Sequence, residues 1–381
     1  MVTRWLRKIG GVAVAAILIA PLPVMADAPL DTTARAIAAG INALPECKGA
    51  AIAIAYQGKA GNGTAFSGTV TYAGGASAAP DANTVFEIGS ITKTFTAMLL
   101  ADAITQKLVT PDDPASMYLP AGTTLPAGDQ GGKVRLIDLA THTSGLPRDL
   151  PDMRYPYSRE QMFAALARVK LATAPGSSWT YSNLGFALLA EAMVGAFKQP
   201  YDKLVADQIT GPLGMTHTRL AEDHSDGAQI PIGYGPKGNR APADNDTWPA
   251  FNGAGALRST LGDMTRYLDF MMSGKGAGSA GAAALLTAFH PYPQTDGKPP
   301  IEQGLAWQQV KTFGNGTGVV WKDGDVPGFS SYIGYAPSIG EGAVVLTNRM
   351  GCKAGRAGLC VIAAAGNQTG ILARKLPDCQ F

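Results

Sequence analysis

Apolar positions follow a strand-like pattern near both ends of the chain and a helical pattern between them. Residues 50–56 predict a short apolar strand, and residues 61–75, rich in Gly and Thr with β-branched residues between, predict a hairpin. Further strand patterns occur at residues 305–310, 319–321, 331–335 and 343–346. Strands at both ends with helices between them indicate an α/β sheet domain interrupted by an all-helical insertion.

Helical patterns occupy most of the middle of the chain. Helices are predicted at residues 31–43, 90–106, 183–197 and 358–376. Two more helices open with capping-box patterns and run through Leu166 and Met271: Ser158-x-x-Gln161 and Thr260-x-x-Asp263. The helix at 183–197 is nearly all apolar, so we expect it to be buried. Residues 221–250 are expected to be a surface excursion, and residues 273–284 a loose linker.

The first 26 residues have the pattern of a signal peptide. Three basic residues precede an apolar run at 9–22, and small or apolar residues follow at 24–26. We expect cleavage near Ala26 and a mature protein that is periplasmic or secreted, with an uncleaved anchor as the alternative. No other run approaches the length of a membrane span.

Composition and charge limit the possible partners. The chain has 381 residues, of which 46% are hydrophobic, so it can bury a large core. The formal net charge is +2, and removing residues 1–26 takes away three basic and no acidic residues. A nearly neutral surface without basic blocks argues against a nucleic-acid partner.

The four cysteines are an even set, which fits disulfides in an oxidising compartment. Cys352–Cys360 as a local clip and Cys47–Cys379 as a tie between the chain ends are weakly favoured, with free or buried thiols as the alternative. There is no C-x-x-C motif and there are four histidines, so we expect no metal site and no cofactor.

Ser90 and Lys93 are three residues apart at the start of an apolar helix. Residues at this spacing share one helix face, so the Lys93 amine and Ser90 Oγ are expected to meet. An amine with a lowered pKa can take the proton of a serine hydroxyl and make it a nucleophile. The alternative is a helix-capping serine followed by a solvent-facing lysine.

Two more motifs lie where a rigid element could hold functional side chains. Tyr181-Ser182-Asn183 precedes the buried helix, and Lys322-Asp323-Gly324 follows a strand pattern. Two nearby lysines would favour the phenolate of Tyr181 and make it a general base. The alternative is a tyrosine that only hydrogen-bonds its loop. Lys322 is expected on an edge strand, with Gly324 allowing substrate backbone to approach closely.

In this order, the three motifs resemble those of the penicillin-recognising serine hydrolases. The branch is that of class C β-lactamases, D-alanyl-D-alanine carboxypeptidases and related esterases. Residues 139–147, 212–215 and 257–260 resemble the same family. The resemblance implies a β-lactamase/transpeptidase-like fold, in which an antiparallel sheet is flanked by N- and C-terminal helices. One catalytic domain would span residues 27–381, with its α/β part at 27–85 and 290–381 and its mainly helical part at 86–289.

The resemblance also implies catalytic roles. Ser90 would be the acylated nucleophile, Lys93 would lower the pKa of its hydroxyl, and Tyr181 would act as base and then as acid. The backbone N–H groups of Ser90 and Asp325 would form the oxyanion hole. Asn183 would hold the acyl side-chain amide and orient Lys93.

Lys322 would polarise Tyr181 and attract a substrate carboxylate, but the chain departs from the family pattern beside it. Asp323 stands where the family has Thr or Ser, and an aspartate facing the cleft would oppose a carboxylate. Side chains alternate along a strand, so Asp323 is also able to point away from Lys322.

The implied function is an exported serine hydrolase acting through an acyl-serine on β-lactams, D-alanyl peptides or both. A carboxylesterase on the same fold is the first alternative, and a penicillin-binding sensor without turnover is the second. A Ser-His-Asp hydrolase is disfavoured because the chain has no G-x-S-x-G motif, and His142 is expected to have a structural hydrogen-bonding role.

Overall fold

The computed structural model describes residues 30–126, 132–150, 157–225, 227–241, 249–278, 281–311 and 318–368. The predicted signal peptide and the end of the predicted tail helix lie outside these ranges, so those predictions stay as they are; Cys379 also lies outside them.

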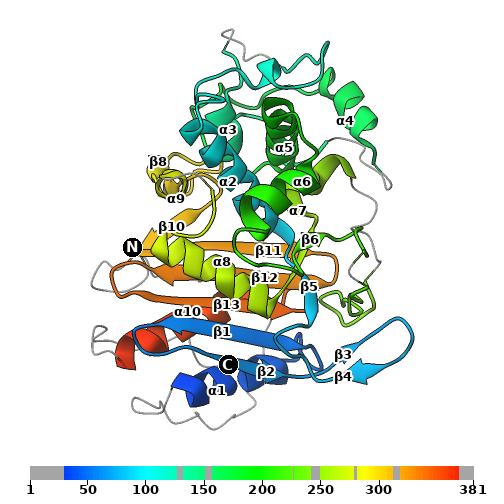
Figure 1. Ribbon diagram of the computed structural model, residues 1–381, viewed down its shortest axis with the longest axis vertical. Coiled ribbons are helices and arrows are strands. Elements are labelled where there is room, and N and C mark those ends of the chain that lie inside the picture. Colours follow the sequence, from blue (N-terminus) through cyan, green and yellow to red (C-terminus); the bar gives the residue numbers. More distant parts are fainter. Residues whose placement is uncertain are drawn as a thin grey trace.

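The described residues build one large antiparallel sheet from both ends of the chain (Figure 1). Its eight strands lie in the order β2 (Gly63–Ser67), β1 (Ile52–Gly58), β13 (Glu341–Thr347), β12 (Phe329–Ala336), β11 (Gly318–Val326), β10 (Gln308–Lys311), β9 (Ile301–Gln303) and β8 (His290–Tyr292). In the centre, Ile52 pairs with Thr347, which joins the N-terminal and C-terminal segments. The predicted α/β class and the antiparallel sheet are confirmed.

Helices cover both faces of this sheet. Helices α1 (Leu30–Ala43) and α10 (Ala354–Gln368) pack on one face, where Ile54 and Val345 are buried. Helix α8 (Leu261–Ser273) packs on the other, where Ile333 and Val344 are buried. Because successive strand residues face opposite sides, a strand covered on both faces is buried throughout, as β13 is, and its middle residues are apolar.

The mainly helical part lies beyond this second face, at the top of Figure 1. Its helices are α2 (Thr92–Thr105), α3 (Leu136–Ala140), α4 (Arg159–Leu166), α5 (Asn183–Phe197), α6 (Tyr201–Val205), α7 (Asn252–Gly255) and α9 (Ala282–Leu286), with short turns η2 (Gly89–Ile91), η3 (Ala115–Met117), η4 (Ala206–Thr210) and η6 (Pro249–Phe251). Helix α5 has the predicted bounds and is mostly buried. Within the described ranges, no helix combines the length and the apolar character needed to cross a membrane.

Both capping patterns start helices. Ser158 and Gln161 form a reciprocal capping box at α4. Thr260 accepts a hydrogen bond from the backbone N–H of Asp263 at α8, while the carboxylate of Asp263 binds Thr218 instead. The expected linker at 273–284 is shorter than predicted, because α9 begins at Ala282.

The hairpin expected within residues 61–75 is wrong. Strand β2 pairs with β1, whereas β3 (Val70–Thr71) pairs with β4 (Ser77–Ala78), so the two halves of the segment join different partners. A small sheet of β5 (Val85–Glu87), β7 (Leu257–Thr260) and β6 (Arg219–Leu220) had no sequence prediction. It joins residue 88 to residue 257, since the N–H of Ile88 donates to the carbonyl of Leu257 at 3.0 Å.

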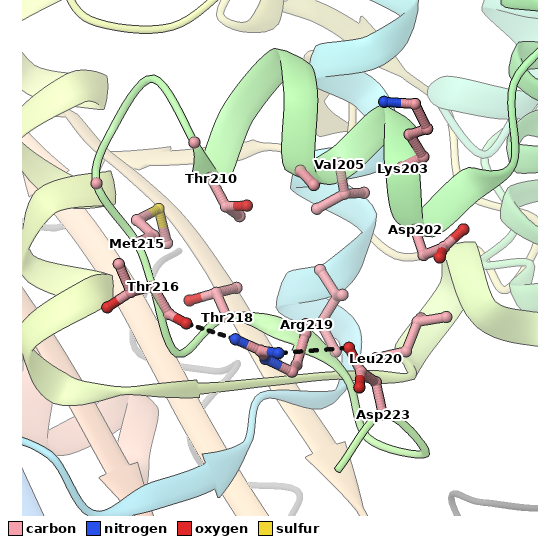
Figure 2. Close-up of a pocket in the computed structure, with 14 residues that line it drawn as sticks. Asp202, Lys203, Val205, Thr210, Met215, Thr216, Thr218, Arg219, Leu220 and Asp223 are labelled. Atoms are coloured by element: carbon pink, nitrogen blue, oxygen red, sulfur yellow. Dashed lines mark hydrogen bonds and ion pairs between the residues drawn. The ribbon is translucent and has the colours of Figure 1, made fainter. Parts of the chain in front are cut away.

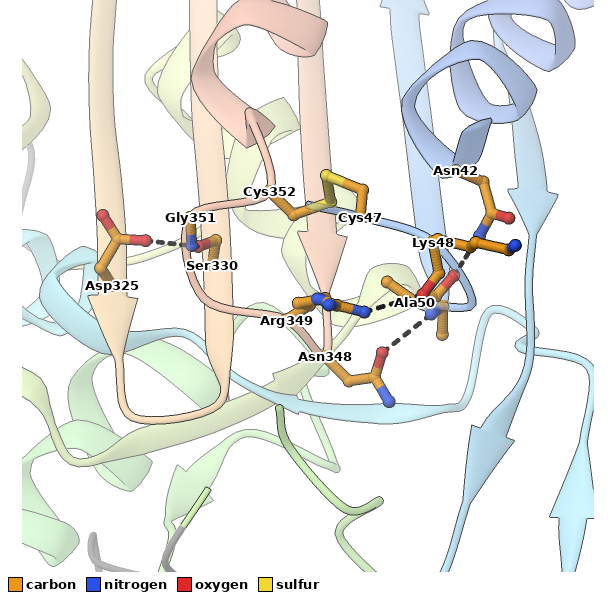
Figure 3. Close-up of a disulfide and its surroundings, with 11 residues drawn as sticks. Asn42, Cys47, Lys48, Ala50, Asp325, Ser330, Asn348, Arg349, Gly351 and Cys352 are labelled. Atoms are coloured by element: carbon orange, nitrogen blue, oxygen red, sulfur yellow. Dashed lines mark hydrogen bonds between the residues drawn. A yellow bond between two sulfur atoms is a disulfide. The ribbon is translucent and has the colours of Figure 1, made fainter. Parts of the chain in front are cut away.

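The disulfide pairing differs from both favoured predictions. Cys47 is bonded to Cys352, with 5.3 Å between their Cα atoms (Figure 3), and Cys360 is disulfide-bonded elsewhere. Cys47 precedes β1 and Cys352 follows β13, so the antiparallel pairing of these strands brings the two cysteines together. The carbonyl of Lys48 accepts a hydrogen bond from Arg349 at 2.7 Å beside them.

Candidate active site

Ser90 lies in the single 3₁₀ turn η2, immediately before the first residue of α2. Lys93, one turn later, donates a hydrogen bond to Ser90 Oγ at 3.1 Å. Gly89 has a φ of +49°, a conformation that side chains disfavour, and it allows the chain to turn tightly into η2. The contact predicted from the spacing of Ser90 and Lys93 is confirmed.

The Lys93 ammonium is buried and has three oxygen partners. Besides Ser90 it donates to Asn183 Oδ1 at 2.8 Å and to the backbone carbonyl of Ala254 at 2.5 Å. These bonds use the full donor capacity of an ammonium group. Burial lowers the pKa of Lys93, and the charges of Lys322 and Arg148 lower it further, against the opposing effect of Tyr181.

Tyr181 approaches Ser90 from the other side. Its hydroxyl donates to Ser90 Oγ at 2.7 Å, while the Nζ atoms of Lys93 and Lys322 lie 5.0 and 5.7 Å from the ring centroid. Burial alone would raise the pKa of Tyr181, but the two lysine charges outweigh it and lower the pKa below its usual 10.0. Ser90 Oγ therefore lies between two groups that are unusually easy to deprotonate.

The loop before α5 holds Tyr181 and Asn183 in place. Ser182 caps α5, because its Oγ accepts from the N–H of Gly185 at 2.8 Å and donates to the carbonyl of Pro147 at 2.7 Å. Asn183 Nδ2 donates to Asp149 Oδ1 at 2.8 Å, which leaves Asn183 Oδ1 turned toward Lys93.

His142 supports the same loop and is buried with a φ of +60°. Its Nδ1 accepts a hydrogen bond from the N–H of Ser182 at 3.0 Å, and its ring lies 4.4 Å from that of Tyr181. Burial and the neighbouring cations Lys93 and Lys322 hold the pKa of His142 well below its usual value. The predicted structural hydrogen bond of His142 is confirmed, with a neutral ring.

Gly324 brings strand β11 against the turn that carries Ser90. A Cβ atom at Gly324 would lie 2.1 Å from the carbonyl oxygen of Ile88 and 2.9 Å from the N of Ser90. The same carbonyl accepts a hydrogen bond from Ser331 Oγ at 2.8 Å, which ties β12 to the turn. Only glycine fits at this position without a shift of the backbone.

Strand β11 lies inside the sheet, but half of its length is an edge, and Lys322 lies in that half, so the edge position predicted for Lys322 holds locally. Strand β10 pairs with residues Gly318–Trp321 of β11, and β12 pairs along its other side. Among the described residues, the segment Lys322–Val326 has a strand partner on one side only, and η2 packs on the face that it shares with β12.

Asp323 does not point away from Lys322. Lys322 Nζ donates to Asp323 Oδ1 at 2.8 Å and to the Asp323 carbonyl at 2.6 Å. The Lys322 side chain is 3% exposed and that of Asp323 is 49% exposed. Burial would lower the pKa of Lys322, but Asp323 and Tyr181 raise it, and the Lys322 charge lowers the pKa of Asp323.

The backbone of Asp325 lies beside Gly89, where a Cβ atom would be 3.1 Å from the N of Asp325. Its side chain accepts a hydrogen bond from Ser330 Oγ, which itself accepts from the N–H of Gly351 at 2.9 Å (Figure 3). The sequence-predicted residues therefore meet around Ser90. They come from α2, the start of α5 and the open half of β11.

Three contributors were missed in the sequence. The Ala254 carbonyl has no side-chain signal, whereas Asp149 and Arg148 directly follow the segment 139–147 that carries the family resemblance. The Arg148 guanidinium lies 5.0 Å from the Tyr181 ring and 3.6 Å from Asp149, so it adds positive charge beside Tyr181.

A separate cavity of about 310 Å³ lies between α6, η4 and β6 (Figure 2). Arg219 crosses it, donating to the carbonyl of Thr216 at 2.7 Å and lying 3.5 Å from Asp223. The residues lining this cavity do not include Ser90, Lys93, Tyr181 or Lys322. The described part of the chain groups no three His, Cys, Asp or Glu residues that could hold a metal ion.

Comparison with known proteins gives a consistent result. The profile of the Beta-lactamase family matches residues 37–365. The chain is 33% identical over 286 residues to the D-alanyl-D-alanine-carboxypeptidase/endopeptidase AmpH of Escherichia coli (strain K12), covering 71% of this chain and 72% of AmpH. It is 28% identical over 297 residues to a β-lactamase of Pseudomonas fluorescens, covering 70% and 80% of the two chains.

Solved structures share the fold. A β-lactamase/D-alanine carboxypeptidase from Yersinia pestis, complexed with citrate, superposes with a TM-score of 0.72 at 24% identity, over 89% of this chain and 99% of that chain. A class C β-lactamase superposes with a TM-score of 0.73 at 22% identity, over 91% and 98%.

Proposed function

This chain belongs to the beta-lactamase family of serine hydrolases, and on that premise we propose that it works through an acyl-serine intermediate at Ser90. The proposed substrates are the amide bonds of β-lactams, of D-alanyl-D-alanine peptides, or of both. One observation carries the proposal: Ser90 Oγ is hydrogen-bonded to Lys93 and to Tyr181, and the pKa of each is lowered.

In the proposed acylation, Tyr181 has first lost its proton to solvent, and Ser90 Oγ attacks the substrate carbonyl carbon while its own proton passes to Tyr181. The carbonyl oxygen becomes an oxyanion, which the N–H groups of Ser90 and Asp325 stabilise; one such donor typically contributes about a hundredfold or more in rate. The tetrahedral intermediate then breaks the bond to the leaving group, which receives a proton from Tyr181.

In the proposed deacylation, water takes the place of the leaving group beside Tyr181. Tyr181 removes a proton from the water, which attacks the acyl carbon, and Ser90 leaves with a proton returned by Tyr181. The lowered pKa of Tyr181 supports this role, because a base that loses its proton more easily is available at lower pH.

Asn183 and Lys322 are proposed to orient the reactants. Asn183 receives one Lys93 hydrogen bond, and its amide is anchored by Asp149, so it fixes the amine against Ser90 and presents a polar edge to the acyl chain. Lys322 is proposed to polarise Tyr181, and Gly324 to let the substrate backbone lie close to β11.

A carboxylesterase on the same fold is the second candidate, and one observation favours it. Asp323 is ion-paired with the lysine that would attract a substrate carboxylate. A substrate without that carboxylate loses nothing from the pairing.

We also propose that the enzyme is exported, to the periplasm or outside the cell. The signal-peptide pattern of residues 1–26 supports this, and so does the disulfide between Cys47 and Cys352, since such bonds persist mainly in oxidising compartments. Comparing the N-terminal residue of the secreted protein with Asp27 would test the cleavage site.

A labelled-penicillin time course on the wild type and on Ser90→Ala tests the function. Label that appears and then disappears supports turnover at Ser90, and permanent label would indicate a sensor. Labelling that persists in Ser90→Ala would remove Ser90 as the nucleophile. A D-alanyl-D-alanine peptide and a short-chain aryl ester, assayed in parallel, then separate a peptidase from an esterase.

A further inference from the structure

The open half of β11 carries an ion pair beside Tyr181, where the proposed mechanism puts the leaving group. Tyr181, the proposed proton donor to the leaving group, has its ring 5.7 Å from Lys322 Nζ. A group attached to the leaving atom therefore comes close to Lys322. The Lys322 side chain is almost fully buried and forms an ion pair with Asp323.

We propose that Asp323 selects acyl donors whose leaving group carries no carboxylate next to the scissile bond, such as esters and C-terminally amidated peptides. This inference rests on the proposed function of Ser90, and it ranks the substrates proposed above: members without that carboxylate are preferred over β-lactams and D-alanyl-D-alanine ends that carry it.

The donor capacity of Lys322 supports the proposal. An ammonium has three N–H groups, and Asp323 takes two of them, through Oδ1 at 2.8 Å and through its carbonyl at 2.6 Å. One N–H remains, so an incoming carboxylate must displace Asp323 to gain the usual pair of charge-assisted bonds.

The geometry of the strand explains why the two side chains meet. Alternation along β11 puts Lys322 and Asp323 on opposite faces, but β10 pairs only as far as Trp321. Because no strand pairs with that edge, the Lys322 side chain can bend along it to reach the Asp323 carboxylate, and it also donates to the Asp323 carbonyl.

The local charge acts in the same direction. Asp323 neutralises Lys322, and Asp325 adds a second carboxylate two residues along the strand, so the remaining positive charge near Tyr181 comes from Lys93 and Arg148 rather than from this edge. The Asp323 side chain is half exposed, so water screens the repulsion and the preference is graded rather than absolute. We expect about a tenfold or larger preference for the uncharged member of a matched substrate pair.

Two substrate pairs test the proposal: a diacyl-tripeptide ending in D-alanyl-D-alanine against its C-terminal amide, and a chromogenic cephalosporin against its methyl ester. The ratio of kcat/KM within each pair is measured for wild type, Asp323→Thr and Asp323→Asn. Asp207→Asn is the control. Asp207 is 42% exposed, and its carboxylate forms an ion pair with Lys203 at 2.6 Å, in a part of the protein separate from the Ser90 site.

Wild type and Asp207→Asn should favour the uncharged substrates. Both Asp323 variants should shift the ratio toward the carboxylates by about tenfold or more, mainly by improving the carboxylate substrates. Unchanged ratios in both variants, with hydrolysis that still depends on Ser90, would overturn the inference and leave the proposed function intact. Hydrolysis that survives Ser90→Ala, or no hydrolysis of any of the four substrates, would overturn the two together.

Discussion

Gly324 touches Ile88 backbone to backbone, with no room for a side chain between β11 and the turn that carries Ser90. The Ile88 carbonyl is also fixed by Ser331 Oγ and the Ile88 N–H by Leu257. The large sheet, the small sheet and the turn η2 therefore meet at a single residue, Ile88, and the position of Ser90 depends on how closely these backbones pack.

Gly324→Ala should lower kcat/KM by about a hundredfold, because the added methyl group would push the turn away from β11 and misplace Ser90. Gly74→Ala is the matched control, since a Cβ atom at Gly74 meets nothing within 4 Å. Steady-state kinetics on both variants, with circular dichroism to confirm folding, measure the effect. Wild-type activity in Gly324→Ala would show that the turn tolerates the displacement.

Asp149→Ala should lower kcat by about tenfold or more, because it removes the carboxylate that anchors Asn183 and hence the orientation of Lys93. Asp149→Asn keeps an acceptor oxygen and should recover much of the loss. Asp112→Ala, which removes an exposed partner of Arg135, serves as the control. If Asp149→Ala and Asp149→Asn are equally impaired, the negative charge matters rather than the anchoring bond.

The profile of kcat/KM against pH should have an acidic limb below pH 10.0. The pKa of Tyr181, the proposed base, is lowered, and kcat/KM falls as the pH drops through that pKa and protonates the base. Lys322→Ala removes a charge that lowers the pKa of both Tyr181 and Lys93, so the limb should move to higher pH. Profiles of kcat/KM against pH for wild type, Lys322→Ala and the exposed control Lys203→Ala measure this. A limb that moves to lower pH in Lys322→Ala would contradict the assignment of the base.

His142→Leu should lower the free energy of unfolding by about 1–3 kcal/mol, because it leaves the buried N–H of Ser182 without its acceptor. His142→Asn retains an acceptor and a residue type that tolerates a φ of +60°, so its loss should be smaller. Urea unfolding measures both variants. A neutral His142 should leave the pH profile of His142→Asn unchanged, and the disappearance of a limb would instead assign it a catalytic proton.

Local patterns in the sequence predicted the elements that depend on local physics. Helix α5 has its predicted bounds because its apolar run and the capping Ser182 define it without help from the rest of the chain. The contact between Ser90 and Lys93 depends only on helical spacing, and it was predicted for the same reason.

Features that depend on strand register could not be predicted in this way. Pairing Cys47 with Cys352 requires knowing that Ile52 lies opposite Thr347, and the open half of β11 requires knowing where β10 stops. Ala254 binds Lys93 through its backbone carbonyl. Every residue has this group, so no residue type in the sequence identifies Ala254 as a partner of Lys93.

The open half of β11 also affects how the protein behaves at high concentration. An unpaired strand edge beside an active site gives access to substrate, but it equally offers backbone groups to another copy of the chain. Within the described ranges the unpaired edge is five residues long, and Lys322, Asp323 and Asp325 place charges on it. The charges that would govern substrate choice therefore also protect the edge from self-association, and a variant that removes both aspartates trades colloidal stability for a wider choice of substrates.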